Sequence, residues 1–260
     1  MPSTQSTERP AIAYRTAGAG PPDLLLVHGW AGTGAYFDET LAALDLTRVR
    51  ATTLDLSGHG ESPSASTPWS IDGIDETILT VADAAGAMRP VLLGFSMGGK
   101  FVQHLALSHP DRVAGLILVA GTQASAIPLP TELLADWYGR AGSAAAMKEM
   151  VTSFLTGPVD DAAFDRWADA AGRIPRADLE GSMEVTCAVD FADELGSLDA
   201  PTLVVAGQRD EFFTPQLLED TIVSQISGAR LALIDCGHEI PLERPHELAA
   251  VIEAFLAGIR

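Results

Sequence analysis

The stretch Leu92-Leu93-Gly94-Phe95-Ser96-Met97-Gly98-Gly99 joins a short apolar run to a helix-like segment through the pattern G-x-S-x-G. This pattern is typical of a tight strand-to-helix turn, in which glycines stand where a Cβ would not fit. The turn holds its serine in strained backbone geometry at the N-terminus of a helix, where backbone N–H groups favour a developing negative charge. Ser96 is therefore the predicted nucleophile.

The segments on either side of this turn match the structure that the pattern requires. Residues 90–93 are short and apolar, as expected of a buried parallel strand. Residues 100–108 have a helical pattern that His109-Pro110 would close. A strand, a tight turn and a helix in this order support the interpretation of Ser96.

Strand-like and helix-like runs alternate through much of the chain. The predicted strands cover residues 11–15, 23–28, 49–55, 90–95, 114–120, 201–206 and 229–234. The predicted helices between them cover residues 35–44, 71–85, 100–108, 215–227 and 245–259. The alternation predicts an α/β fold with a doubly wound, mostly parallel sheet and right-handed crossovers. Ligands of such sheets bind outside the carboxyl ends of the strands.

One segment interrupts the alternation, because residues 124–197 contain no convincing strand. Helical patterns cover residues 131–140, 143–155, 160–171 and 176–190, with prolines and glycines between them. A segment of this length is too long for a simple loop. We therefore predict a core domain of residues 1–123 and 198–260 and a helical lid, or cap, of residues 124–197.

The composition restricts the partners of the chain. Its 260 residues suffice for a sizeable core, and its net charge of −19 argues against nucleic acid and anionic membranes as partners. The first ten residues lack the apolar region of a signal peptide, and no apolar run has the length of a membrane span. Cys187 and Cys236 are isolated, so we expect buried thiols rather than a disulfide, and a cytoplasmic location.

A serine hydroxyl needs a base to become a good nucleophile, and the base needs a group that orients it. His238 is the favoured base, because its loop follows the apolar run 231–234 and can reach the serine. Asp210 is the favoured acid, with Glu211 as the near alternative, because both follow the predicted strand 201–206. In chain order, Ser96 is followed by Asp210 and then by His238, which is the order typical of a nucleophile in a G-x-S-x-G turn with its acid and base.

Two backbone donors are expected to bind the oxyanion that forms when the serine attacks a carbonyl carbon. Met97 N–H follows the nucleophile directly, and Trp30 N–H follows the predicted strand 23–28. We expect His28 to shape the Trp30 loop through hydrogen bonds rather than to act as a base. The sequence shows no cluster of Cys and His ligands, so neither a metal nor an organic cofactor is expected.

Five landmarks together resemble the α/β-hydrolase fold family, in its lidded esterase and lactonase branch. They are His28-Gly29-Trp30, the run 55–62, the run 94–99, Gly207-Gln208-Arg209-Asp210, and Gly237-His238 with Glu243-Arg244-Pro245. The resemblance implies a serine hydrolase of a carboxylic ester or lactone that works through an acyl-enzyme. It also implies that His59, in the Gly58-His59-Gly60 turn, is structural. Oligomeric state and the identity of the substrate are not predicted.

The apolar neighbours of the catalytic candidates predict a small-molecule substrate with an apolar or aromatic group. The candidate substrate-binding residues are Phe95, Trp137, Phe212 and Ile240. Three alternatives stay open: a hydrolase of C–C bonds in ring-cleavage products, a cofactor-free perhydrolase or haloperoxidase, and a ligand receptor on the same fold. Phe95 argues against the first, because that branch usually has Asn before its serine. Lys100-Phe101 departs from the Gly-Glu that the second commonly carries.

Overall fold

The computed structural model describes residues 12–259 around a seven-stranded sheet of order β1-β3-β2-β4-β5-β6-β7. β1 (Tyr14–Gly18) runs antiparallel to β3 (Arg50–Leu54), and every other neighbouring pair is parallel. The remaining strands are β2 (Asp23–Val27), β4 (Val91–Phe95), β5 (Gly115–Val119), β6 (Thr202–Gly207) and β7 (Arg230–Ile234). The predicted doubly wound, mostly parallel α/β fold is confirmed.

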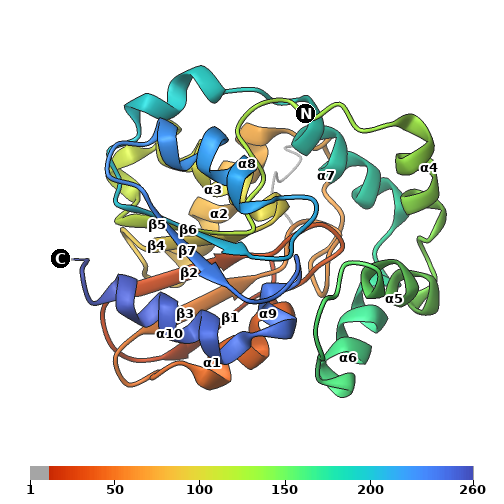
Figure 1. Cartoon of the computed structure of the whole chain (residues 1–260), viewed down its shortest axis with the longest axis horizontal. Helices are drawn as coiled ribbons and strands as arrows, with labels where there is room; N and C mark the ends of the chain where they lie inside the picture. The colour runs from red at the N-terminus through yellow and green to blue at the C-terminus, as the bar shows by residue number, and fades with distance from the viewer. Residues whose placement is uncertain (1–11, 260) are drawn as a thin grey trace, which may run out of the picture.

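The central strands contribute to a hydrophobic core on each face of the sheet. In β2, Leu24 and Leu26 belong to one core and Leu25 and Val27 to the other, because successive side chains of a strand point to opposite faces. This explains why the central strands are apolar at nearly every position. Helices α1 (Asp38–Ala43) and α10 (Pro245–Leu256) cover one face. The other face is covered by α2 (Ile71–Ala84), α3 (Met97–Ser108) and α8 (Pro215–Thr221) (Figure 1).

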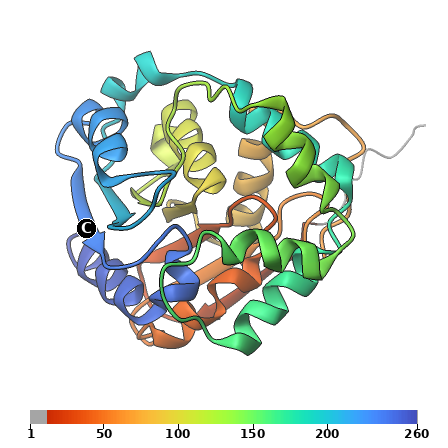
Figure 2. The ribbon, with the colours of Figure 1, turned by 45° about the vertical axis from the view of Figure 1, so that its right-hand side comes forward.

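Helices occupy the chain between β5 and β6. They are α4 (Thr131–Gly139), α5 (Ala144–Thr152), α6 (Asp161–Ala171), α7 (Arg176–Ala188) and the 3-10 helix η3 (Ala192–Ser197). Figures 1 and 2 show α4, α5 and α6 grouped at one side of the molecule. Met147 and Trp167 of this insertion share a hydrophobic core with Leu248 of α10, so the insertion packs on the α/β core. The domain boundaries at 123/124 and 197/198 stay a prediction.

Several element boundaries differ from the sequence prediction. The predicted strand 11–15 begins outside the described residues, and β1 starts at Tyr14. α3 begins at Met97 rather than at residue 100, because Ser96 itself takes the N-cap position. The predicted helix 35–44 is split into η1 (Gly34–Phe37) and α1, and 215–227 into α8 and η4 (Val223–Gln225). Three short elements were not predicted: η2 (Pro110–Arg112), η3 (Ala192–Ser197) and α9 (Ile240–Glu243).

Cys187 and Cys236 are both free thiols, as expected from their isolation in the sequence. Cys236 is buried as expected, but Cys187 is only partly buried, because it lines a cavity. Within residues 12–259, no helix combines the length and the apolar character that crossing a membrane requires.

Candidate active site

Ser96 lies between the end of β4 and the first residue of α3, in a backbone conformation that side chains seldom adopt. Its φ is +49° and its ψ is −118°. Three hydrogen bonds maintain this geometry: Ser96 N–H donates to Val119 O at 2.9 Å, and Ser96 O accepts from Gly99 N–H at 2.8 Å and Thr122 N–H at 3.0 Å. The end of β5 therefore fixes the turn that presents the serine.

The glycines around Ser96 are required by close backbone packing. A Cβ on Gly94 would collide with the carbonyl oxygen of Gly98, and a Cβ on Gly98 would collide with the carbonyl oxygen of Val27. Strand, turn and helix therefore meet at a distance that only glycine permits at these two positions.

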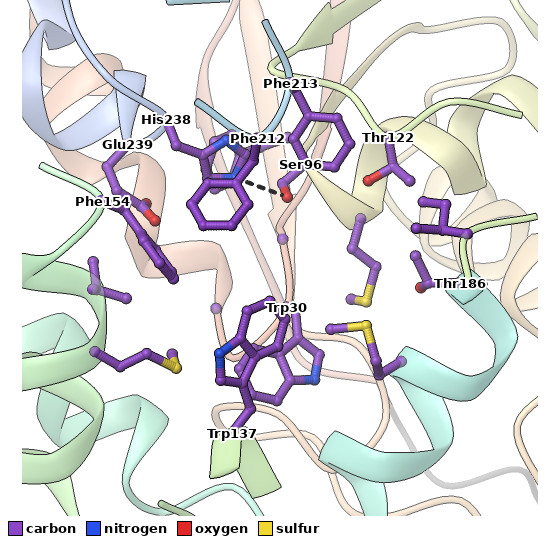
Figure 3. Close-up of a pocket in the computed structure, with 18 of the residues that line it drawn as sticks. Trp30, Ser96, Thr122, Trp137, Phe154, Thr186, Phe212, Phe213, His238 and Glu239 are labelled. Atoms are coloured by element: carbon purple, nitrogen blue, oxygen red, sulfur yellow. Dashed lines mark hydrogen bonds between the residues drawn. The ribbon is translucent and has the colours of Figure 1, made fainter. Parts of the chain in front are cut away.

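The structure joins the three predicted catalytic residues in one chain of hydrogen bonds. The Nε2 atom of His238 lies 3.1 Å from Ser96 Oγ (Figure 3). Its Nδ1 atom lies 2.8 Å from Asp210 Oδ2. Asp210 follows β6 and His238 follows β7, so the parallel sheet brings both to the carboxyl end where Ser96 lies. Asp210 Oδ1 accepts hydrogen bonds from Phe212 N–H at 2.8 Å and Phe213 N–H at 3.0 Å.

Burial and charge act in opposite directions on the two ionisable members of this chain. Burial alone would raise the pKa of Asp210, but the hydrogen bond and charge of His238 and two backbone N–H groups hold that pKa below its ordinary value. Burial alone would lower the pKa of His238. The hydrogen bond and charge of Asp210, together with Glu239 and Glu243, raise that pKa above its ordinary value. The carboxylate thus favours an imidazolium at His238, the state that follows proton transfer from a serine.

His28 organises the loop after β2 through both of its ring nitrogens. Leu56 N–H donates to His28 Nε2 at 3.0 Å, so Nδ1 carries the proton and donates to Gly29 O at 2.8 Å. Burial lowers the pKa of His28 to about 3, which keeps the ring neutral. These contacts support the expectation that His28 shapes the loop.

The two predicted oxyanion donors both flank Ser96. Met97 is the first residue of α3, and the loop of Trp30 approaches so closely that a Cβ on Gly29 would lie 3.2 Å from Ser96 Cβ. The indole N–H of Trp30 donates to Leu179 O of α7 at 2.9 Å, which ties this loop to the helical insertion. Their role as an oxyanion hole stays a prediction.

An apolar cavity opens beside Ser96 and His238, between the sheet edge and the helical insertion (Figure 3). Aromatic side chains contribute much of its wall: Trp30, Tyr36, Phe95, Trp137, Phe154, Trp167, Phe212 and Phe213. Phe95, Trp137 and Phe212 line the cavity, and their role in substrate binding stays a prediction. Ile240 is a correction: it is the first residue of α9, is fully buried in the core, and is not among the lining residues.

Several lining residues were missed by the sequence prediction. Tyr36 and Glu239 lie on the wall next to His238, and Met150, Thr186 and Cys187 come from the helical insertion. The position of Glu239 directly after His238 was a usable signal, because neighbours of a catalytic residue often border its site. Nothing in the sequence pattern indicates that Tyr36 or Thr186 faces the same cavity.

His59 and His104 take no part in the hydrogen-bonded chain of Ser96, His238 and Asp210. His59 is fully buried in the turn after β3, where its Nδ1 lies 2.8 Å from Ser57 O. His104 Nδ1 lies 2.8 Å from Asp75 Oδ2, in a pair that joins α3 to α2. Among residues 12–259, no group of three His, Cys, Asp or Glu side chains is arranged to hold a metal ion.

The family model of the alpha/beta hydrolase fold matches residues 22–158, more than half of the chain. The chain belongs to the α/β-hydrolase fold family. The prediction of an enzyme of the α/β-hydrolase class is thereby confirmed, and relatives named as esterases agree with it.

Two curated proteins and one solved structure illustrate the similarity. The chain is 29% identical to a pimeloyl-[acyl-carrier protein] methyl ester esterase of Nitrosomonas europaea, over 94% of this chain and 99% of the relative. It is 29% identical to lipase LipV of Mycobacterium tuberculosis, over 92% of this chain and 94% of the relative. A hydrolase from Pseudomonas aeruginosa PA01 superposes with a TM-score of 0.80 at 26% identity, covering 98% of this chain and 100% of that one.

Proposed function

We propose that this α/β hydrolase cleaves carboxylic esters through a covalent acyl-enzyme, with Ser96 as the nucleophile. The observation that carries the proposal is the hydrogen-bonded chain Ser96–His238–Asp210 at the wall of an apolar cavity. A serine, a base within hydrogen-bond reach and a carboxylate that orients the base are the arrangement that nucleophilic acyl transfer requires.

The reaction follows from this geometry in two halves. Ser96 Oγ attacks the carbonyl carbon while its proton passes to His238 Nε2, and the alcohol then leaves with that proton. Water next attacks the acyl-enzyme and gives a proton to His238, which returns it to Ser96 as the acid departs. Asp210 holds Nδ1 protonated and stabilises the imidazolium in both halves. The steps use this chain's residues and water.

Trp30 N–H and Met97 N–H are the proposed donors to the oxyanion of the tetrahedral intermediates. Met97 directly follows Ser96, and Gly29, the residue before Trp30, packs against Ser96. Removing one such donor in a serine hydrolase costs about 10²–10³ in kcat. The helical insertion of residues 124–197 is the proposed lid, because Trp137 and Phe154 bring its apolar surface to the cavity.

The proposed substrate is a small ester with an apolar or aromatic group, which suits the aromatic wall. Lactones are internal esters and would follow the same steps, so they belong in the substrate panel. The two free thiols fit a reducing compartment, and the cytoplasm remains the proposed location.

The test compares hydrolysis of p-nitrophenyl esters of increasing acyl length, and of simple lactones, by the native protein and by Ser96→Ala. We expect a loss of about a thousandfold or more in the variant. The control is Ser66→Ala, which removes an exposed serine and should leave the rate unchanged. Native turnover that survives in Ser96→Ala would overturn the proposal, and tight ligand retention without turnover would favour a receptor.

A further inference from the structure

The cavity wall contains a buried acid outside the Ser96–His238–Asp210 chain. Glu239 is only 6% exposed and borders the cavity together with Tyr36. The Tyr36 hydroxyl donates a hydrogen bond to Glu239 Oε2, and its ring stacks on Phe95 with 5.0 Å between the centroids. Figure 3 shows the carboxyl of Glu239 beside Phe154, on the same side of the cavity as His238. The acid is therefore held in place and borders the space next to the reacting serine.

The lining residues offer little to balance a negative charge. Among the cavity-lining residues that the structure describes, Glu239 is the sole one with a carboxyl group, and none is a lysine or an arginine. Burial raises the pKa of Glu239, although the nearby His238 lowers it in part. Burial and the charge of Glu239 together raise the pKa of Tyr36 well above its ordinary value. The cation that can form nearby, protonated His238, is already paired with Asp210.

A second carboxylate brought into this space would meet two penalties. It would leave water without gaining a cationic partner, and a buried unpaired charge is costly. It would also be repelled by Glu239 in the ionised form of that acid, because the low dielectric among the aromatic rings of the cavity wall strengthens repulsion between like charges. The net charge of −19 adds a repulsion at long range. An uncharged group would avoid both the cost of burying an unpaired charge and the repulsion by other negative charges.

We propose that Glu239 is a specificity-determining residue, which makes this site accept esters whose acyl or alcohol group is uncharged and exclude those that carry a carboxylate. Tyr36 positions the Glu239 carboxyl for this task. The proposal rests on the proposed function, because it concerns the substrate of the same site.

The test measures binding rather than turnover, on Ser96→Ala at neutral pH. Two probes share one shape and differ in charge: the monomethyl ester of adipic acid and the methyl ester of adipic acid monoamide. A second pair, the hexanoate esters of glycolic acid and of glycolamide, carries the same difference on the alcohol. Binding is followed by calorimetry or by the fluorescence of Trp30 and Trp137 in the cavity wall.

In at least one pair, the amide should bind about tenfold more tightly than the carboxylate. Adding Glu239→Gln to Ser96→Ala should narrow this ratio of binding affinities to about threefold or less, because glutamine keeps the shape of the glutamate side chain and removes its charge. The matched control is Glu211→Gln, which removes an exposed carboxylate outside the cavity and should leave the ratio unchanged. If the glutamine variant does not fold, Glu239→Leu should narrow the ratio in the same way.

Three results would overturn the inference. They are equal binding of amide and carboxylate in both pairs, an unchanged ratio in the Glu239 variants, and no binding of either probe. Because the measurement needs no turnover, a failure of the proposed catalysis would appear in the Ser96→Ala hydrolysis test and remain distinguishable from these results.

Discussion

The buried carboxyl of Glu243 binds the backbone of Gly237, the residue directly before His238. Glu243 Oε1 accepts a hydrogen bond from Gly237 N–H at 3.0 Å. Its Oε2 accepts from Thr156 N–H at 3.0 Å and from Thr156 Oγ1 at 3.1 Å, in the loop between α5 and α6. One side chain thus connects the loop that carries the histidine with the helical insertion that covers the cavity.

Glu243 is accordingly expected to act as a positioning residue. Glu243→Gln replaces one acceptor oxygen by an N–H₂ group, which leaves Gly237 N–H or Thr156 N–H without its partner at a cost of about 1–3 kcal/mol. We expect kcat to fall about tenfold, as a misplaced base transfers protons less well. Since Glu243 also raises the pKa of His238, the acid limb of the rate profile should move to lower pH.

Steady-state kinetics across pH on p-nitrophenyl esters checks this expectation. Glu247→Gln is the matched control, because Glu247 is an exposed acid in the first turn of α10. A lower melting temperature with unchanged kcat and an unchanged pH profile would show that Glu243 has a purely structural role.

The choice between Asp210 and Glu211 is settled by a paired substitution. Asp210→Asn keeps the shape of the side chain and removes the charge that stabilises the imidazolium, so kcat/KM should fall by about 10³–10⁴. Glu211 is exposed, and Glu211→Gln should change kcat/KM by less than about twofold. Equal losses in the two variants would contradict the assignment of Asp210.

The rate of the native protein should depend on pH through His238. His238 must be neutral to accept the serine proton, and its pKa lies above the ordinary 6.5 because the effects of Asp210, Glu239 and Glu243 exceed that of burial. Activity is therefore lost as the pH falls through this raised value, and kcat/KM should reach half of its plateau above pH 6.5. The profile of kcat/KM for a neutral ester measures this directly. A midpoint below 6.5 would contradict the hydrogen-bonded pair.

Much of the fold and the core of the candidate site could be predicted because short-range rules determine them. Leu24 to Val27 are apolar in succession because both faces of β2 are buried, and the sequence shows this directly. Gly94 and Gly98 mark the turn because a Cβ fits at neither position. Asp210 and His238 follow strands, and parallel strands carry such residues to one edge of the sheet.

The cavity wall could not be predicted in the same way, because it is made by packing between distant segments. Tyr36 and Glu239 are far apart in sequence and meet only when η1 lies against the loop before α9. Ile240 was expected in the wall from its position near His238, but a turn of α9 directs it into the core. Position in the sequence indicated the candidate catalytic residues, which the structure brings together, but it misplaced Ile240.

Lys100 binds the backbone of the helical insertion next to the cavity wall. It lies fully buried in the first turns of α3, and its Nζ donates to Ser125 O at 2.9 Å and Thr186 O at 2.8 Å. Thr186 stands in the last turn of α7 and lines the cavity, so the amine connects the helix of the serine to the cavity wall. Lys100→Met removes both bonds and leaves two carbonyl groups unpaired. We expect a loss of about 1–3 kcal/mol in the free energy of unfolding, and a higher KM.

Lys100 should also make the free energy of unfolding depend on pH, which separates the effect of its charge from that of its packing. Burial lowers the pKa of Lys100 to about 8, against an ordinary value of 10.5. Between these two values the unfolded chain binds more protons than the folded one, so the contribution of Lys100 to the free energy of unfolding rises with pH. The free energies of unfolding of the native protein and Lys100→Met should therefore differ more at the upper end of this pH window than at the lower end.

Urea denaturation at several pH values measures this difference between the native protein and Lys100→Met. Lys148→Met, which changes the other lysine of the chain at a partly exposed site, should run parallel to the native protein. A constant difference between native protein and Lys100→Met would mean that the Lys100 amine keeps its ordinary pKa, and that water reaches it behind the cavity wall.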